Sequence, residues 1–330
     1  RLPWLSGRTC DLSAVQSMHT RPTPRVGGIA IFGALGLFSI FGSGPISGTY
    51  SAFVLVTSLL FFVGLAEDFG FHMSPRRRML AAIGSSLLTI WLFGVWLPRT
   101  GIPVLDPLME YSAVGIPLTI LVTAGISNGF NLIDGVNGLA SLTAIVTALA
   151  LSQIAEISGY STMAHLPMFV AAGVFGFFLI NYPLGLIFLG DAGAYTIGFV
   201  LSWFGIAVLV NAPDVSPWAI LLTFFWPAAD TSLAVYRRLR RNTDVSAPDR
   251  LHVHQIIMRG LEICVLGQNR RQIANPLTTL VLAPFVIAPP IAGVLLWNQN
   301  WNAFLAVLAF GLLLFVGYAA APNLIRRFRR

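Results

Sequence analysis

Apolar segments long enough to cross a lipid bilayer follow one another along most of this chain. A transmembrane helix needs about 20 mainly apolar residues, because the hydrocarbon core of a bilayer is about 30 Å thick. Hydrophobic residues make up 56% of the sequence and charged residues 10%, whereas a soluble domain carries about 25% charged residues. We therefore predict an all-α fold, a polytopic transmembrane helical bundle that forms one integral-membrane domain over residues 1–330. The predicted spans, about ten in number, are residues 27–47, 50–66, 80–97, 114–130, 138–154, 163–181, 193–211, 216–236, 277–297 and 301–321.

The arginines orient these spans. All 20 basic residues are arginine, and basic residues concentrate in the cytoplasmic loops of membrane proteins. If residues 1–25 are cytoplasmic, the alternation of the spans places 19 of the 20 arginines inside and leaves Arg99 outside. The net charge of +7 then has a topological explanation, and no basic patch with interleaved aromatic residues favours nucleic acid as a partner. Residues 237–275 are predicted to form a cytoplasmic loop that contains Arg and His.

Four short polar segments interrupt the apolar sequence, and the predicted topology places all of them on the cytoplasmic side. Ionisable residues at the ends of membrane spans are costly, so they are candidates for function by default. Together the four segments predict a composite, metal-dependent active site at a membrane surface. They are Glu67 with Asp68, residues 128–137 (NGFNLIDGVN), residues 190–194 (GDAGA) and residues 249–255 (DRLHVHQ).

Two of these segments place Asn and Asp side chains at helix boundaries. Asn128, Asn131 and Asp134 are spaced by three residues, so successive helical turns present them to one side; a capped loop is the alternative. Asp191 lies at a helix start, where backbone N–H groups favour a phosphate or a carboxylate. Its carboxylate would be a hard ligand for Mg²⁺, and the alternative is a helix N-cap.

The other two segments carry an acid pair and an imidazole pair. Glu67 and Asp68 could bind a divalent metal or supply a base, or they could simply be a solvated helix end. His252 and His254 can face one ligand from a loop. Zinc would need further soft ligands, so a diphosphate held with the help of Arg250 fits better; a solvated basic loop is the alternative.

In their order along the chain, these segments resemble the polyprenyl-phosphate N-acetylhexosamine-1-phosphate transferase family (glycosyltransferase family 4). Members of the undecaprenyl-phosphate GlcNAc-1-phosphate transferase type are the more similar ones, because of PTPRVGG and the HVHQ segment. Such members have eleven spans, which implies one further helix upstream of residue 1. The resemblance is carried by residues 19–28 (HTRPTPRVGG), 64–68 (GLAED), 74–80 (SPRRRML), 128–140 (NGFNLIDGVNGLA), 181–199 (NYPLGLIFLGDAGAYTIGF), 227–238 (PAADTSLAVYRR) and 249–260 (DRLHVHQIIMRG).

The resemblance implies an Mg²⁺-dependent phosphotransferase, with Mn²⁺ able to take the same place. The phosphate of a polyprenyl (undecaprenyl) phosphate attacks the β-phosphorus of a UDP-sugar, which yields a lipid-diphosphate sugar and UMP and initiates a cell-envelope polysaccharide. Two anionic substrates must meet, so a metal and cations are needed to offset their charge. The resemblance also implies a multi-pass protein of the bacterial inner membrane with a cytoplasmic active site, and it leaves a homodimer open.

By the same resemblance, Asp191 binds the metal. Asp68 activates or orients the lipid phosphate, with Glu67 beside it and Asp134 nearby in the nucleotide and metal site. The residues assigned to substrate binding are Asn128, Asn131, Asn137, Arg78, Asn181, Arg250, His252 and His254.

Several positions depart from the family pattern, and other classes of function stay open. Glu67 stands where Asp is usual, Asn137 where a second Asp is usual, and Gln255 where another His is common. These changes bear on sugar specificity. A transporter or flippase would also carry buried polar groups, but usually near the bilayer midplane on broken helices. An inactive relative that serves as an assembly partner is the third class, and the sequence names neither the sugar nor the polysaccharide pathway.

Overall fold

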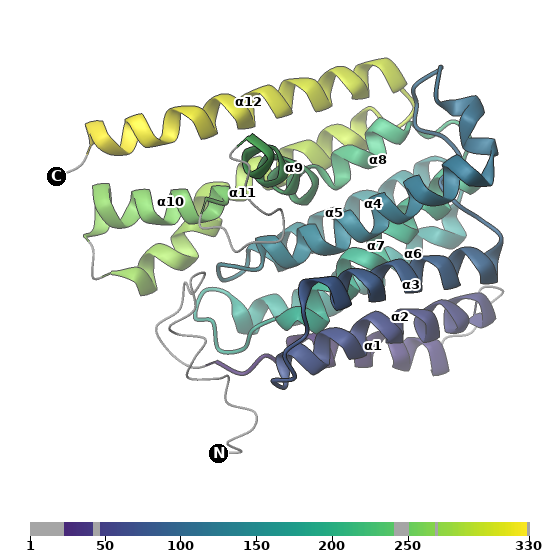
Figure 1. Cartoon of the computed structure of the whole chain (residues 1–330), viewed down its shortest axis with the longest axis horizontal. Helices are drawn as coiled ribbons and strands as arrows, with labels where there is room; N and C mark the ends of the chain where they lie inside the picture. Colours follow the sequence, from purple (N-terminus) through teal and green to yellow (C-terminus); the bar gives the residue numbers. More distant parts are fainter. Residues whose placement is uncertain (1–22, 42–46, 241–250, 268–269, 329–330) are drawn as a thin grey trace.

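The computed structural model describes residues 23–41, 47–240, 251–267 and 270–328, and regular structure in these ranges is helical throughout (Figure 1). The predicted all-α polytopic fold is confirmed. The helices are α1 (Gly27–Phe41), α2 (Ser47–Asp68), α3 (Pro75–Phe93), α4 (Ser112–Ile133), α5 (Leu139–Ile157), α6 (Ser161–Asn181), α7 (Gly190–Asn211), α8 (Pro217–Thr223), α9 (Phe225–Arg240), α10 (Val253–Leu261), α11 (Arg271–Leu295) and α12 (Asn300–Arg327).

Seven of the described helices are long and apolar enough to cross a membrane, or eight if α8 and α9 are one broken span. This is fewer than the ten predicted spans. The first predicted span is represented by α1, which has 15 described residues. The third corresponds to α3, whose first turn carries three arginines and whose start is fixed by Ser74, which accepts a hydrogen bond from the backbone of Arg77. The seven helices are α2, α4, α5, α6, α7, α11 and α12.

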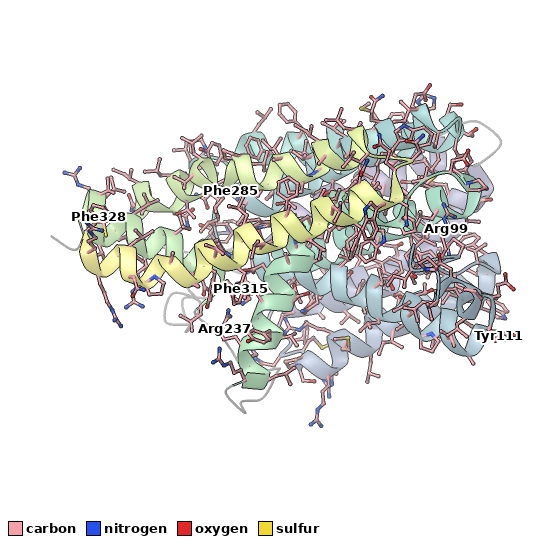
Figure 2. All side chains as sticks on the ribbon, turned by 90° about the horizontal axis from the view of Figure 1, so that it is seen from above. Arg99, Tyr111, Arg237, Phe285, Phe315 and Phe328 are labelled. Atoms are coloured by element: carbon pink, nitrogen blue, oxygen red, sulfur yellow. The ribbon has the colours of Figure 1, made fainter. Side chains whose placement is uncertain are left out.

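The predicted continuous span at residues 216–236 is wrong. The chain bends by 84° between α8 and α9, at Phe224. Average hydropathy over a window cannot detect such a bend, because both halves are apolar. The bend directs α9 across the bundle, where it packs against α4 and α11. In Figure 2, α9, which carries Arg237, lies at a steep angle to α12.

The segment predicted as a loop at residues 237–275 is largely helical where it is described. It contains the end of α9, all of α10, a π-helix at Glu262–Leu266 and the start of α11. Residues 241–250 lie outside the described part of the chain, and with them the predicted substrate-binding residue Arg250.

Helix α7 forms the centre of the bundle. It is the most deeply buried of the long helices, and it packs against α1, α2, α4, α5 and α6. Helix α12, in contrast, lies along one side of the molecule and leaves most of its surface outside the bundle (Figures 1 and 2). In Figure 2, Arg99 and Tyr111 lie at one end of the molecule and Phe328 at the other. The polar segments predicted from the sequence meet at the end opposite Arg99, because the last turns of α2 and α4 and the first turn of α7 come together there.

Candidate active site

The start of α7 is capped by a side chain from α2. The two carboxylate oxygens of Asp68 accept the backbone N–H groups of Asp191 (2.9 Å) and Ala192 (3.0 Å), which are otherwise unsatisfied at a helix N-terminus. A negative charge there is also stabilised by the helix dipole. The Asp68 side chain is 1% exposed, and the guanidinium of Arg25 lies 3.7 Å from its Oδ1. A helix start that favours phosphate or carboxylate thus receives a carboxylate from within the protein.

The approach of Asp68 to α7 requires glycine at position 190. Gly190 has φ +77°, and a Cβ atom there would lie 2.5 Å from Asp68 Oδ2. A side chain would be excluded both by the backbone conformation and by the lack of space. Asp68 therefore determines where the next residue, Asp191, is placed.

Asp191 points its carboxylate towards two other helices. Arg78 of α3 forms an ion pair with Oδ2, and Asn131 of α4 donates to Oδ1 at 3.1 Å. The guanidinium of Arg78 also lies over the ring of Tyr195, 6.0 Å from its centroid, and the Tyr195 hydroxyl donates to Asn128 at 3.4 Å. The Asp191 side chain is 13% exposed, so of the two aspartates Asp191 is the one that a ligand can reach.

Asp134 completes a group of three carboxylates. It is the C-cap residue of α4, one helical turn beyond Asn131. Burial raises the pKa of Asp134 well above its usual range, and the charges of Asp191 and Asp68 raise it further, whereas Arg25 and the backbone N–H of Gly190 lower it. Crowded carboxylates favour either a bound proton or a bound cation. The arrangement can therefore attract a metal ion.

His252 and His254 lie beside this group, at the start of α10. The N-cap residue of α10 is His252, whose backbone N–H donates to Gln255 Oε1 at 3.3 Å. Both imidazole side chains are buried, and their rings stack with centroids 5.8 Å apart. The alternative interpretation, a solvated basic loop, is thus excluded for these two residues.

His254 reaches the carboxylate group through Gly135. A Cβ atom at Gly135 would lie 2.4 Å from His254 Nε2, so the imidazole packs directly on the backbone of residues 128–137. Burial lowers the pKa of His254 to about 4, with the charge of Asp230 raising it and that of His252 lowering it. His254 is therefore a neutral imidazole at neutral pH.

Two predicted substrate-binding amides instead hold backbone segments together. Asn181 accepts the N–H of Gly138 at 2.6 Å and donates to the carbonyl of Ile187 at 2.8 Å. Asn137 donates to the carbonyl of Pro183 at 2.9 Å. Both side chains are buried. They fix the loop after α4 against the segment that leads into α7, and a direct role in substrate binding stays a prediction.

Residues near the start of the described chain join the same region by backbone contacts. Gly27 and Gly28 donate to the carbonyls of Phe188 and Leu189 at 3.0 and 2.9 Å, directly before α7. This pairing brings Arg25 to Asp68. Glu67, in contrast, accepts the backbone N–H of Met73, so its carboxylate closes the turn between α2 and α3.

A magnesium ion fits this set of donors. Within the described residues, no three His, Cys, Asp or Glu side chains form a complete ligand set. Mg²⁺, however, usually binds one or two protein carboxylates and takes its other oxygen ligands from water and substrate phosphates. The accessible carboxylate of Asp191 and the crowded carboxylate of Asp134 match that pattern, and Asn131 supplies an amide beside them.

Part of the chain that includes residues of this site matches a known protein family. A family model described as glycosyl transferase family 4 matches residues 50–209, and this match contains Asp68, Asp134 and Asp191. Over these residues, which are just under half of the chain, the protein is similar to members of this family. The family resemblance predicted from the sequence motifs is therefore confirmed.

Individual relatives extend the match beyond these residues. A protein of Bacillus subtilis (strain 168), called "probable undecaprenyl-phosphate N-acetylglucosaminyl 1-phosphate transferase", is 28% identical over 251 residues, which is 75% of this chain and 69% of the relative. The undecaprenyl-phosphate alpha-N-acetylglucosaminyl 1-phosphate transferase of Yersinia pestis is 28% identical over 333 residues, covering 97% of this chain and 87% of the relative. The protein of the same name from Escherichia coli (strain K12) is 28% identical over 262 residues, covering 76% and 69%.

One residue of this site was not assigned a role from the sequence. Asp230 of α9 is 2% exposed and accepts hydrogen bonds from His252 Nδ1 (2.7 Å) and from the backbone N–H of Val253 (3.1 Å). The signal that could have found it is a carboxylate within an otherwise apolar stretch, PAADTSLAVY. Asp230 lies in one of the segments that carried the resemblance, but its partner, His252, is 22 residues away. The 84° bend before Asp230, which directs α9 across the bundle, was also not revealed by the sequence.

Proposed function

We propose that this protein transfers an N-acetylhexosamine-1-phosphate, with N-acetylglucosamine-1-phosphate the first candidate, from a UDP-sugar to undecaprenyl phosphate and releases UMP. The reaction takes place at the cytoplasmic face and depends on Mg²⁺. The relatives' names support the acceptor and the transferred group. The arginine distribution supports the orientation.

One observation carries the proposal: Asp68, Asp134, Asp191, Arg78 and the two buried histidines meet at one end of the bundle, although they come from five separate helices or helix ends. A reaction between a phosphate anchored in lipid and a water-soluble diphosphate needs such a site at the membrane surface. A bound Mg²⁺ would supply Lewis-acid stabilisation of the phosphate charge.

Each group of residues then has a task. Asp191, held by Asn131 and Arg78, binds the metal together with Asp134. Arg78 has the cationic fork that phosphate oxygens prefer, so it can exchange its contact with Asp191 for one with a substrate phosphate. Asp68 keeps the first turn of α7 in place. This contact supports the orienting role predicted for Asp68 more than proton removal, because both of its oxygens already accept hydrogen bonds.

The decisive experiment uses the purified chain with undecaprenyl phosphate, Mg²⁺ and a panel of UDP-sugars, and measures the release of UMP and the formation of lipid-diphosphate sugar. We expect turnover with UDP-N-acetylglucosamine or a close N-acetylhexosamine relative. No UMP from any UDP-sugar of the panel would contradict the proposal.

Asp191→Asn provides the matching test of the metal. A neutral amide is a poorer hard ligand than a carboxylate, so we expect nearly complete loss of turnover with normal insertion into the membrane. EDTA should stop the unaltered protein, and added Mg²⁺ or Mn²⁺ should restore it. Asp214→Asn is the control, because Asp214 is exposed and lies beyond the other end of α7. Near-normal turnover of Asp191→Asn would remove this residue from the mechanism.

A transporter is the second candidate, favoured by the 84° break that leads into α9 and its buried Asp230, since broken helices with buried polar groups are typical of transporter sites. Proteoliposomes distinguish the two functions. Uptake of an intact nucleotide sugar without release of UMP would indicate transport.

A further inference from the structure

A buried acid–imidazole pair lies beside the carboxylate group and is not explained by metal binding. Asp230 Oδ2 is 2.7 Å from His252 Nδ1, and each residue is 2% exposed. The other oxygen, Oδ1, accepts the backbone N–H of Val253 at 3.1 Å. Two hydrogen bonds from one short segment fix the orientation of the carboxylate, and the carboxylate in turn fixes the ring of His252.

The geometry determines which nitrogen of His252 carries a proton towards Asp230. An ionised carboxylate only accepts hydrogen bonds, so a contact of 2.7 Å requires Nδ1 to be the donor. The Nε2 atom then points away from Asp230. Among the described residues it has no hydrogen-bond partner, although it is buried, and the same holds for both ring nitrogens of His254.

Unpartnered polar atoms at buried positions are costly, and a ligand is one reason for a protein to retain them. The surroundings indicate the charge of that ligand. His254 stacks on His252 and packs on Gly135, directly after Asp134. Of the two imidazoles, only His252 has a carboxylate within hydrogen-bond distance of its ring, and the free Nε2 of that ring is the atom left to meet an anionic oxygen.

We propose that Asp230 is a positioning residue of the active site. It holds His252 with a proton on Nδ1 and balances the positive charge of the ring when Nε2 donates a hydrogen bond to an anionic oxygen of the nucleotide sugar's diphosphate. This inference rests on the proposed function for the identity of the ligand. The tautomer of His252 does not depend on it.

The tautomer is tested first, on the complete protein in lipid nanodiscs. ¹⁵N-histidine spectra separate protonated from unprotonated ring nitrogens, and the difference from His252→Gln identifies the signals of His252 among the five histidines. In the unaltered protein we expect a protonated Nδ1, and we expect Nε2 to become protonated as well when UDP-N-acetylglucosamine is added. A ring protonated at Nε2 alone would overturn the proposal, whatever the protein's activity.

The second test replaces the carboxylate. The amide of Asp230→Asn can donate to Nδ1, which moves the ring proton to Nε2 and removes the balancing charge. The ring then meets the diphosphate as a neutral donor, and loss of the charge assistance to that hydrogen bond predicts a rise in KM for the UDP-sugar by roughly tenfold. Asp230→Glu should recover part of that loss, and Asp214→Asn should behave as the unaltered protein does.

The outcomes separate this inference from the proposed function. An unchanged KM together with a protonated Nδ1 in Asp230→Asn would overturn the positioning role even if the transferase activity is established. If the unaltered protein releases no UMP but shows the expected tautomer, the proposed function fails while the Asp230–His252 pair stands. Should Asp230→Asn not fold, the spectrum of the unaltered protein with and without UDP-N-acetylglucosamine decides.

Discussion

Asp68 and Asp191 are two neighbouring carboxylates with opposite surroundings. Asp68 is almost completely buried and accepts two backbone N–H groups, whereas Asp191 is partly exposed and is held by side chains alone. A side-chain partner can be exchanged for a substrate or a metal ion, but a backbone partner cannot be given up without disturbing the helix. The first residue is therefore suited to support the site and the second to bind.

Asp68→Asn should lower stability as well as turnover. The amide offers one accepting oxygen to two N–H groups, and hydrogen bonds to charged groups contribute about 1.5–3 kcal/mol. We expect a lower midpoint of thermal unfolding in detergent and a lower rate, with little change in KM for the UDP-sugar. Glu67→Gln is the control for stability, because an amide oxygen can still accept the N–H of Met73. An unchanged midpoint in Asp68→Asn would contradict the capping role.

His254 should make the protein less stable in mild acid. Its pKa is lowered to about 4 in the folded protein, against about 6.5 for an unperturbed histidine. Between these values the unfolded chain binds more protons than the folded one, so stability falls as the pH falls from 6.5 to about 4. The full effect is roughly 3 kcal/mol.

The effect of His254 on stability has to be measured as the difference between a His254 variant and the unaltered protein. Asp134 acts in the opposite direction, because its raised pKa lets the folded state hold a proton that the unfolded state has lost. Thermal unfolding midpoints of His254→Gln and of the unaltered protein should converge as the pH falls from 6.5 to 4. The exposed His72 provides the control, His72→Gln, which should follow the unaltered protein. A constant difference over this range would show that His254 is not kept neutral by the fold.

Helices α9 and α10 build the part of the site that local sequence patterns describe least well. The spacing of Asn128, Asn131 and Asp134 predicted that their side chains lie on one side of the helix, and the structure confirms it. This could be predicted because helix periodicity is a local property of the sequence. GDAGA was likewise correctly placed at a helix start. The contact of Asp230 with His252 depends on the 84° bend at Phe224, and the cap on α7 joins residues 68 and 191. Neither a bend between apolar helices nor a long-range contact leaves a periodic signal.

Gly135→Ala tests whether α10 must lie close to the loop after α4. The added Cβ would lie 2.4 Å from His254 Nε2, about 1 Å nearer than an ordinary contact, so the imidazole has to move. Misplacement of about 1 Å can reduce turnover about a hundredfold, and we expect a loss of that order. Gly125→Ala in α4 is the matched control, because no atom lies within 4 Å of its added Cβ. Equal turnover in the two variants would show that the contact is not needed.

The arginines of the described chain are distributed unevenly between the two ends of the molecule, and this distribution predicts its orientation in the membrane. The site lies at the end of the bundle that carries Arg76, Arg77, Arg78 and the arginines at the end of α9, whereas Arg99 lies at the opposite end. For these described arginines, the structure agrees with the segregation predicted from the sequence. The number of spans was predicted less well, because hydropathy does not distinguish a straight crossing from a bent pair such as α8 and α9.

Single-cysteine labelling tests the orientation. After Cys10 and Cys264 are replaced by Ser, we expect Tyr111→Cys to react with a membrane-impermeant thiol reagent in intact cells. Arg240→Cys, at the end of α9, should react only after the cells are opened. Both positions are exposed, so lack of reaction cannot be attributed to burial. Rapid labelling of Arg240→Cys from outside would reverse the topology and move the active site with it.

Helix α7 is clamped at both ends by residues from elsewhere in the chain. Asp68 holds its N-terminus with two hydrogen bonds, and at the far end Arg99 donates three, to the carbonyls of Leu209, Ala212 and Val215. A piston-like or screw-like motion of α7 would break both sets at once. Asp191 is thus held at a fixed position in the bundle, and the substrates must be brought to it. The movements that admit a long lipid and release a nucleotide have to come from the segments packed around α7.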